Sequence, residues 1–257
     1  MRRFGLIGYP LSHSFSRNYF TEKFHRENIT DASYELFPLE KIELFPELIS
    51  SQKDLAGLNV TIPYKEKIIP YLDELDETAK AIGAVNTLQF RIQNSEFKIV
   101  GHNTDAYGFR QSLKPFLTSA HERALILGTG GASKAVEYVL KQIGVECIFV
   151  SRDKKNIPGK TILTYAELNE YVMKACKLIV NCSPVGTFPN VNESPAIPYE
   201  FITPEHFLYD LVYNPAETEF LEKGKAKGAL TMNGLDMLKM QAEKAWEIFN
   251  SKFRIQD

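Results

Sequence analysis

The sequence of 257 residues predicts an α/β protein with two domains. Segments rich in branched and aromatic residues alternate with helix-like segments, which is typical of parallel sheets. The alternation starts afresh near residue 107, and a glycine-rich turn opens this second block. With 44% hydrophobic residues, the chain can bury one or two sizeable cores.

The first block predicts a mixed α/β domain built on a parallel sheet. Its strands are expected at Phe4–Ile7, Tyr34–Phe37 and Leu58–Ile62, and its helices at Ser16–Glu27 and Lys41–Ile49. Two further strand-like runs, 87–93 and 96–100, flank Asn94-Ser95 and predict a hairpin at a sheet edge. A helix over 107–117 follows.

The second block predicts strands at Ala124–Leu127, Glu146–Val150, Leu178–Val180, Leu208–Leu211 and Leu230–Thr231. The segment from Gly234 to about Phe249 has apolar residues at helical spacing, so it predicts a helix that packs back on the first domain. The expected boundaries are 1–106 plus 236–257 for the first domain and 107–235 for the second.

Composition argues against several classes of protein. The formal charge of -2, with both signs mixed along the chain, gives no footprint for nucleic acid. No signal or membrane segment is indicated, and Cys147, Cys176 and Cys182 lack the spacing of a metal site. We therefore expect a cytoplasmic protein that binds a small molecule and no metal, as a monomer or a homodimer.

The glycine-rich turn predicts a Rossmann-like, doubly wound second domain. Gly128 and Gly130 follow an apolar strand and precede a helix-forming stretch, which is the setting of a dinucleotide-binding turn. Ser133 replaces the third glycine and is still small enough for the helix and strand to approach. A glycine-rich turn without a ligand is the alternative.

The residues after the next strand favour NADP(H) over NAD. Arg152, next to Ser151, offers a planar guanidinium for a 2′-phosphate, and Lys154 and Lys155 add positive charge. Asp153 is the complication, because an acid at this place can accept from the ribose hydroxyl of NAD. A solvated charged loop is the third reading.

Lys65 is the candidate acid–base group of the first domain. If Thr61 caps a helix that Pro63 opens, Lys65 lies in its first turn, where the helix dipole disfavours a positive charge. Such a charge is either well solvated or functional.

Short polar side chains gather at three other predicted strand ends. They form the clusters His13-Ser14-Phe15-Ser16, Asn86-Thr87 and Asn103-Thr104-Asp105. Together with Asn59, Thr61 and Lys65 they suit a small polyhydroxy acid bound at the carboxyl ends of the strands. Taken singly, Ser14, Ser16, Thr104 and Asp105 fit helix capping better than ligand binding, and His13 and His102 fit structural hydrogen bonds better than metal ligation.

Taken together, these motifs resemble the shikimate dehydrogenase family over nearly the whole chain. The resemblance includes Gly8-Tyr9-Pro10, Asn59 to Lys65, Gly83 to Thr87, Asn103-Thr104-Asp105, the turn at Gly128, Tyr213-Asn214-Pro215 and Gly234 to Gln241. It implies reversible, NADP-dependent reduction of 3-dehydroshikimate to shikimate in aromatic amino acid biosynthesis.

The resemblance also implies roles for individual residues. Lys65 and Asp105 would be catalytic; Ser14, Ser16 and Tyr213 would meet the substrate carboxylate; and its hydroxyls would be held by Asn59, Thr61, Asn86, Asp105 and Gln241. The expected cofactor-binding residues are Gly128, Thr129, Gly130, Gly131, Ala132, Ser151, Arg152, Ser183 and Gly234.

Two departures from the family pattern leave alternatives open. Asp153 stands where a threonine is usual, and Thr187 follows Gly186 where a methionine is usual. The main rival is therefore a quinate/shikimate dehydrogenase that uses NAD. A non-catalytic NADP-binding regulatory protein is a rival from another class.

Overall fold

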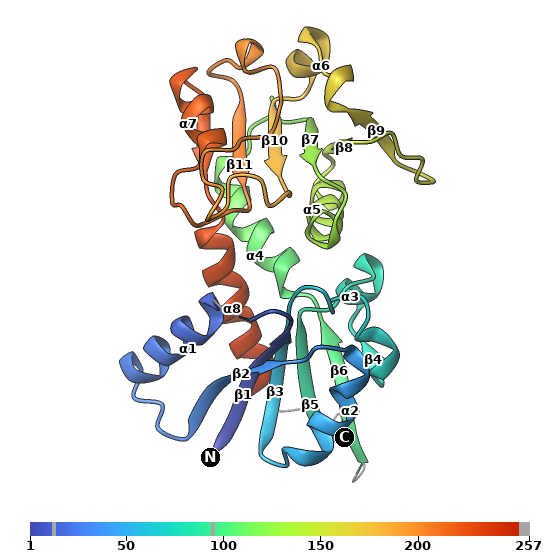
Figure 1. Cartoon of the computed structure of the whole chain (residues 1–257), viewed down its shortest axis with the longest axis vertical. Helices are drawn as coiled ribbons and strands as arrows, with labels where there is room; N and C mark the ends of the chain where they lie inside the picture. Colours follow the sequence, from blue (N-terminus) through green and yellow to red (C-terminus); the bar gives the residue numbers. More distant parts are fainter. Residues whose placement is uncertain (12–13, 94–95, 252–257) are drawn as a thin grey trace. The chain divides into compact units, whose positions relative to one another are not determined.

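The structure is a computed structural model that describes residues 1–11, 14–93 and 96–251. The chain forms two compact units, each built on a six-stranded sheet (Figure 1). Unit 1 comprises Met1–Tyr107 with Lys239–Asp257, and unit 2 comprises Gly108–Leu238. The α/β fold class is thereby confirmed.

The sheet of unit 1 has the strand order β2-β1-β3-β5-β6-β4. Its strands are β1 (Arg2–Gly8), β2 (Ala32–Pro38), β3 (Leu55–Val60), β4 (Glu74–Leu75), β5 (Thr87–Gln93) and β6 (Glu96–His102). β5 and β6 pair antiparallel, but they do not form the expected sheet edge, because the short β4 pairs with β6. The predicted turn at Asn94-Ser95 lies outside the described residues.

Helical segments cover both faces of this sheet. Phe4 and Leu6 on β1 pack toward α1 (Phe15–Arg26) and the end of α8 (Leu235–Asn250), whereas Ile7 packs toward the opposite face. That second face is covered by η1 (Ile42–Leu44), α2 (Phe45–Ser51), η2 (Ile69–Tyr71) and α3 (Glu77–Ile82).

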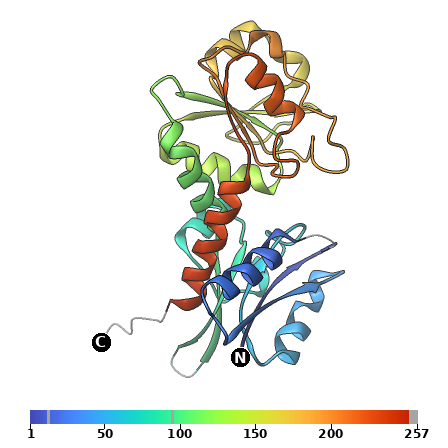
Figure 2. The same cartoon turned by 90° about the vertical axis from the view of Figure 1, so that its left-hand side faces the viewer.

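The C-terminal part of α8 packs on unit 1, as the apolar stripe predicts. The Phe249 ring stacks on Phe4 with centroids 4.9 Å apart, and the Trp246 ring meets Phe4 edge-on at 5.3 Å. On the outer side, Lys23 of α1 forms an ion pair with Glu243 of α8, and the two helices lie side by side in Figure 2. This packing fixes the position of Gln241 within unit 1.

The sheet of unit 2 is entirely parallel, with the order β12-β11-β10-β7-β8-β9. Its strands are β7 (Arg123–Leu127), β8 (Glu146–Ser151), β9 (Thr161–Thr164), β10 (Leu178–Asn181), β11 (Phe207–Asp210) and β12 (Leu230–Met232). The helical segments are α4 (Thr104–Leu113), which begins in unit 1, η3 (Lys114–Phe116), α5 (Gly131–Gln142), η4 (Tyr165–Glu167), α6 (Glu170–Ala175), η5 (Tyr199–Phe201) and α7 (Glu219–Ala226). Helices on both faces make this a doubly wound sheet, as predicted.

The segment after β3 differs from the prediction. The strand ends at Val60, and residues 61–68 form successive turns in place of a helix opened by Pro63. The reason is tertiary: the Lys65 carbonyl accepts from the Val85 amide at 2.7 Å, so it is not part of a helical ladder. Lys65 therefore does not lie in the first turn of a helix, and the surroundings of its amine are set by the side chains that it contacts.

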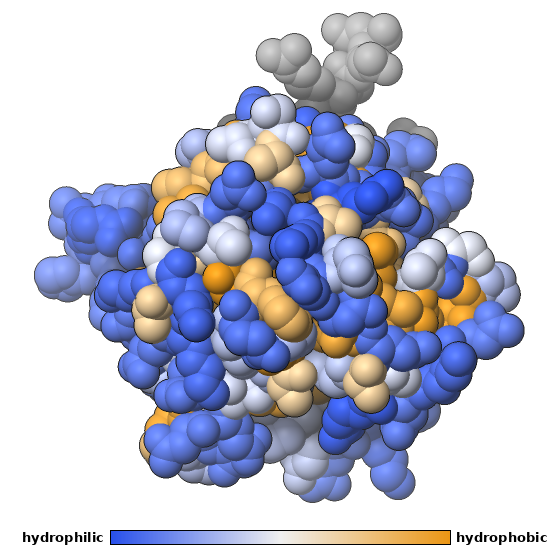
Figure 3. Space-filling view, turned by 90° about the horizontal axis from the view of Figure 1, so that it is seen from above, coloured by the Kyte–Doolittle hydropathy of each residue, from blue (hydrophilic) through white to orange (hydrophobic). Residues whose placement is uncertain are grey.

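Within the described residues, no helix combines the length and apolar character needed to cross a membrane. On the face shown in Figure 3, hydrophilic residues predominate and hydrophobic ones form only small groups.

Candidate functional site

Lys65 and Asp105 form a close ion pair in unit 1. The Lys65 Nζ lies 2.6 Å from Asp105 Oδ2, and their side chains are 21% and 12% exposed. Asp105 lies in the first turn of α4. Asn103 caps this helix, because the Asn103 Oδ1 accepts from the Ala106 amide at 3.2 Å. Neither Thr104 nor Asp105 is the cap, so both side chains are available for other contacts.

The Asn86 side chain hydrogen-bonds to both Asp105 and Thr104. Its Nδ2 donates to Asp105 Oδ1 and to Thr104 Oγ1, both at 2.9 Å, and its Oδ1 accepts from the Thr104 amide at 2.7 Å. Gln241 joins from α8, where its Oε1 accepts from Thr104 Oγ1 at 3.2 Å. The carboxylate of Asp105 is thus fixed on one oxygen by an amide and on the other by an ammonium.

The same network extends from Asn86 through Thr87 to Asn59 on β3. Asn59 donates from Nδ2 to Thr87 Oγ1 at 3.0 Å, and its Oδ1 accepts from the Tyr34 hydroxyl at 2.8 Å. The Ser16 side chain lies close to the same hydroxyl. Burial raises the pKa of Tyr34, so its phenol stays a neutral donor.

Five predicted residues are therefore joined in one network, namely Asn59, Lys65, Asn86, Asp105 and Gln241, and Ser16 lies beside it. Ser14 caps α1 by accepting from the Arg17 amide at 3.3 Å, and the Thr61 amide donates to Ile7 at the end of β1. Tyr213 belongs to unit 2.

Of the two histidines next to these motifs, His102 lies within the described residues and has a carboxylate partner. The His102 Nδ1 lies 2.8 Å from Asp76 Oδ2, which fits the expected structural hydrogen bond, and His13 lies outside the described residues. In the described part of the chain, no group of three or more potential metal ligands is found.

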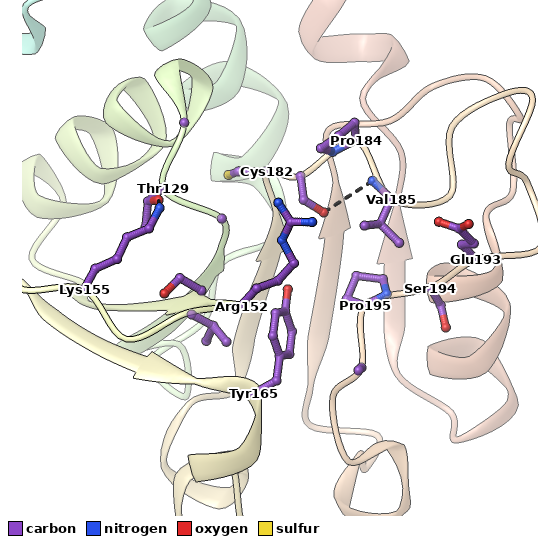
Figure 4. A pocket seen from close by; sticks show the side chains of 16 residues that line it. Thr129, Arg152, Lys155, Tyr165, Cys182, Pro184, Val185, Glu193, Ser194 and Pro195 are labelled. Atoms are coloured by element: carbon purple, nitrogen blue, oxygen red, sulfur yellow. Dashed lines mark hydrogen bonds between the residues drawn. The ribbon is translucent and has the colours of Figure 1, made fainter.

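Unit 2 contains a pocket of about 660 Å³ at the carboxyl ends of its central strands (Figure 4). Predicted cofactor residues that line it are Gly128, Thr129, Gly130, Ser151, Arg152 and Ser183. The remaining lining residues are Val150, Lys155, Tyr165, Cys182, Pro184, Val185, Glu193, Ser194, Pro195 and Ala196.

The glycine turn has the geometry that a dinucleotide requires. Gly128 has φ +107°, a conformation that favours glycine, and a side chain at Gly130 would project into open space. Ser133 is buried, and its hydroxyl donates to the Gly130 carbonyl at 2.6 Å. The serine therefore closes the turn where the third glycine would stand, and the backbone at Gly130 stays open to a phosphate.

Two cations from the β8–β9 loop face this pocket. Figure 4 shows Arg152 above the Tyr165 ring, and Lys155 reaching to Thr129, to which its Nζ donates at 2.8 Å. Asp153 does not line the pocket. Among the described residues, Arg152 has no ion pair, so its guanidinium is available to an anion. The pocket thus fits a dinucleotide with a phosphate on its adenosine ribose.

The opposite wall comes from the end of β10. Asn181 Oδ1 accepts from the Ser183 hydroxyl at 2.6 Å and from its amide at 3.0 Å. Burial raises the pKa of the Cys182 thiol, which favours its neutral form. This wall therefore presents neutral polar groups to the pocket.

Three predicted cofactor residues do not line the pocket. Gly131 and Ala132 are the first residues of α5, and Gly234 precedes α8. A Cβ on Gly234 would lie 2.3 Å from the Leu211 carbonyl oxygen, so glycine is required there for packing in unit 2.

A family model described as the shikimate dehydrogenase substrate binding domain matches residues 6–88. The shikimate dehydrogenase (NADP(+)) of Carboxydothermus hydrogenoformans is 40% identical over 257 aligned residues, covering 95% of this chain and 89% of that protein. The chain belongs to the shikimate dehydrogenase family.

Solved structures of the family share its fold. Shikimate 5-dehydrogenase of Thermus thermophilus, in complex with NADP(H) and shikimate, is 32% identical with a TM-score of 0.81, over 97% of this chain and 94% of that one. Quinate dehydrogenase of Corynebacterium glutamicum, in complex with NAD, is 27% identical with a TM-score of 0.83, over 97% and 93%.

Some residues of both regions were not among those predicted from sequence. Tyr34 joins the network of unit 1, and Tyr165 lines the pocket of unit 2. Thr87, Thr104 and Lys155, which stand in motifs named from the sequence, also belong to these two regions. Tyr34 had no sequence signal, because a tyrosine in a strand is ordinarily a core residue.

Proposed function

We propose that this chain catalyses the reversible, NADP-dependent reduction of 3-dehydroshikimate to shikimate, a step of aromatic amino acid biosynthesis. The observation that carries this proposal is the Lys65–Asp105 pair, held by Asn86 in a chain of the shikimate dehydrogenase family. The protein acts in the cytoplasm as a monomer or a homodimer.

The substrate binds to the polar network of unit 1. Its hydroxyls are held by Asn59, Thr61, Asn86, Asp105 and Gln241, and its carboxylate by Ser14 and Ser16. The network supports the roles of its own members, because their amides and hydroxyls are already oriented by one another, which reduces the entropy lost on binding. The contact of Tyr213 with the carboxylate stays a prediction of the family resemblance.

Lys65 is the proton donor to the ketone oxygen. Reduction of the ring ketone adds a hydride to carbon and a proton to oxygen, so negative charge develops on that oxygen during the reaction. The Lys65 ammonium stabilises this charge and transfers a proton, and the reverse reaction returns the proton to its amine. Asp105 holds the amine at 2.6 Å and orients the reacting hydroxyl.

NADP(H) is held by the pocket of unit 2. The backbone at Gly128, Thr129 and Gly130 binds the pyrophosphate, aided by the start of α5, and Arg152 binds the 2′-phosphate. Ser183 and Gly234 lie beside the nicotinamide half. When bound, NADPH supplies the hydride.

An NAD-dependent quinate/shikimate dehydrogenase is the second candidate, because Asp153 follows Arg152. Two cations and no Asp153 side chain line the pocket, which supports NADP. The test is steady-state reduction of NADP and of NAD by the purified protein, with shikimate and then quinate as donor. Turnover of shikimate mainly with NADP supports the proposal, whereas turnover mainly with NAD or quinate moves the protein to the second candidate. The absence of turnover with any pair would leave a non-catalytic cofactor-binding protein.

A further inference from the structure

The loop between β8 and β9, residues 152–160, carries both cations of the cofactor pocket and is attached at two points, to the glycine turn before α5 and to α5 itself. Lys155 donates to Thr129, in the turn that leads into α5. Lys160, at the other end of the loop, forms a short ion pair with Glu137, which lies near the middle of α5. The helix that begins at the glycine turn therefore also holds the loop that carries Arg152.

The Glu137–Lys160 contact is shielded from solvent. The two side chains are 12% and 21% exposed, and the Lys160 ammonium lies 4.3 Å from the centroid of the buried Phe149 ring on β8. Burial by itself would raise the pKa of Glu137, but hydrogen bonds from Lys141 and Lys160 hold it below its ordinary value, so the carboxylate stays charged. The lysine is thus fixed between a strand and a helix.

A buried ion pair is not an efficient way to stabilise a fold, because the cost of desolvating both charges offsets most of their attraction. Such a pair is better suited to fixing a register, since removing Glu137 takes away the charge that offsets the Lys160 ammonium. The residue whose register is fixed here is Lys160, eight residues after Arg152 in a loop without regular secondary structure over 154–157.

We propose that Glu137 and Lys160 are positioning residues for cofactor selectivity, and that their ion pair holds the β8–β9 loop so that Arg152 and Lys155 face the 2′-phosphate of NADP. This inference rests on the proposed function. Neither residue lines the pocket, so the effect is transmitted through the position of the loop.

The experiment compares Lys160→Met and Glu137→Gln with the wild type in steady-state kinetics with NADP and with NAD. The KM for NADP rises by roughly 5- to 10-fold, in the range expected for one coupled contact. The KM for NAD and the kcat at saturation stay within about twofold, because the pyrophosphate site and the substrate site are untouched. The ratio of kcat/KM for NADP to that for NAD therefore falls, which a loss of general stability would not produce.

Lys141→Met is the matched control. Lys141 pairs with the same Glu137 carboxylate at 2.8 Å, but it lies on α5 and does not hold the loop. Lys141→Met keeps the cofactor selectivity of the wild type. Lys160→Arg, which retains the charge that Lys160→Met removes, keeps it as well.

Two outcomes overturn the inference. Unchanged selectivity in both Lys160→Met and Glu137→Gln shows that the loop needs no such anchor, and an equal loss in Lys141→Met shows that the charge of Glu137 matters and the link to the loop does not. A wild type that does not prefer NADP contradicts the proposed cofactor itself. The wild-type ratio of kcat/KM for NADP to that for NAD therefore separates a failure of the proposed function from a failure of this inference.

Discussion

The Asp105 carboxylate is held from both sides, with Oδ2 at 2.6 Å from the Lys65 ammonium and Oδ1 at 2.9 Å from the Asn86 amide. An ammonium tied in this way keeps one orientation with little entropic cost. Since a proton donor acts only within hydrogen-bond reach of its target, this constraint is what makes Lys65 suitable for catalysis.

Asp105→Asn should lower kcat by about 10²-fold or more, because the Lys65 amine loses its charged partner while the side chain keeps its shape. The KM for NADP should stay within a few-fold, since unit 2 is unchanged. Steady-state kinetics in both directions measures this. Asp54→Asn, which breaks an exposed ion pair with Arg3 in the same unit, is the control. A wild-type kcat in Asp105→Asn would remove the carboxylate from the mechanism.

Asn86→Ala should reduce both stability and turnover. The Thr104 amide, buried and bonded to Asn86 Oδ1 at 2.7 Å, would lose its acceptor, at a cost of about 1–3 kcal/mol in the free energy of unfolding. Denaturant titration and kcat would be measured on the same sample. Asn18→Ala, at an exposed position of α1, should change neither by much; equal effects of both substitutions would contradict this role of Asn86.

Arg152→Met should weaken NADP binding by roughly 1.5–3 kcal/mol, which is the contribution of a charge-assisted hydrogen bond, and change NAD binding much less. Cofactor titration followed by fluorescence would give both dissociation constants. Lys154→Met is the matched control, because Lys154 is 82% exposed and does not line the pocket. Equal losses for NADP and NAD in Arg152→Met would rule out a contact with the 2′-phosphate.

Asp210 should make the stability of the protein depend on pH. Burial raises the pKa of Asp210 to about 6, although hydrogen bonds from Thr218, Val212 and Asn181 oppose the shift. The folded state therefore binds this proton more tightly than the unfolded chain does. The resulting stability is complete below about pH 4 and is lost as the pH rises through about 6, by roughly 3 kcal/mol in total.

Unfolding of the wild type and of Asp210→Asn at about pH 4 and about pH 8 checks this pH dependence. The stability of the wild type relative to the variant should fall between the two values. Asp153→Asn, at an exposed carboxylate of the same unit, controls for general effects of pH. A constant difference between wild type and Asp210→Asn would show that Asp210 does not titrate in this range.

Where a segment is long and uniformly apolar, the sequence predicts its structure well. Ala124–Leu127 was expected as a strand, and β7 contains it because all four residues are buried between helices. β9 was not predicted because it is an edge strand with no buried residue, and α6 was not predicted because a helix of 6 residues gives too little periodicity. The helix expected at Pro63 was wrong because a distant residue, Val85, bonds to the Lys65 carbonyl.

The candidate site was predictable in its residue types but not in its connections. Lys65 and Asp105 stand in motifs that the family resemblance singles out, yet only the folded chain brings them within 2.6 Å. The role of Tyr34 could not be predicted, because its hydroxyl on β2 donates to Asn59 on β3 only when both strands pair with β1 in the folded sheet. Local patterns carry no information about such contacts.

The most direct test of the proposed chemistry is the turnover of Lys65→Met, measured with NADPH and 3-dehydroshikimate beside the neighbouring variant Lys67→Met. Removing the proton donor should lower kcat by about 10²–10⁴-fold while KM stays within a few-fold, and Lys67→Met, at an exposed position, should keep the kcat of the wild type. Full turnover by Lys65→Met would contradict the assignment of Lys65 as the acid–base group.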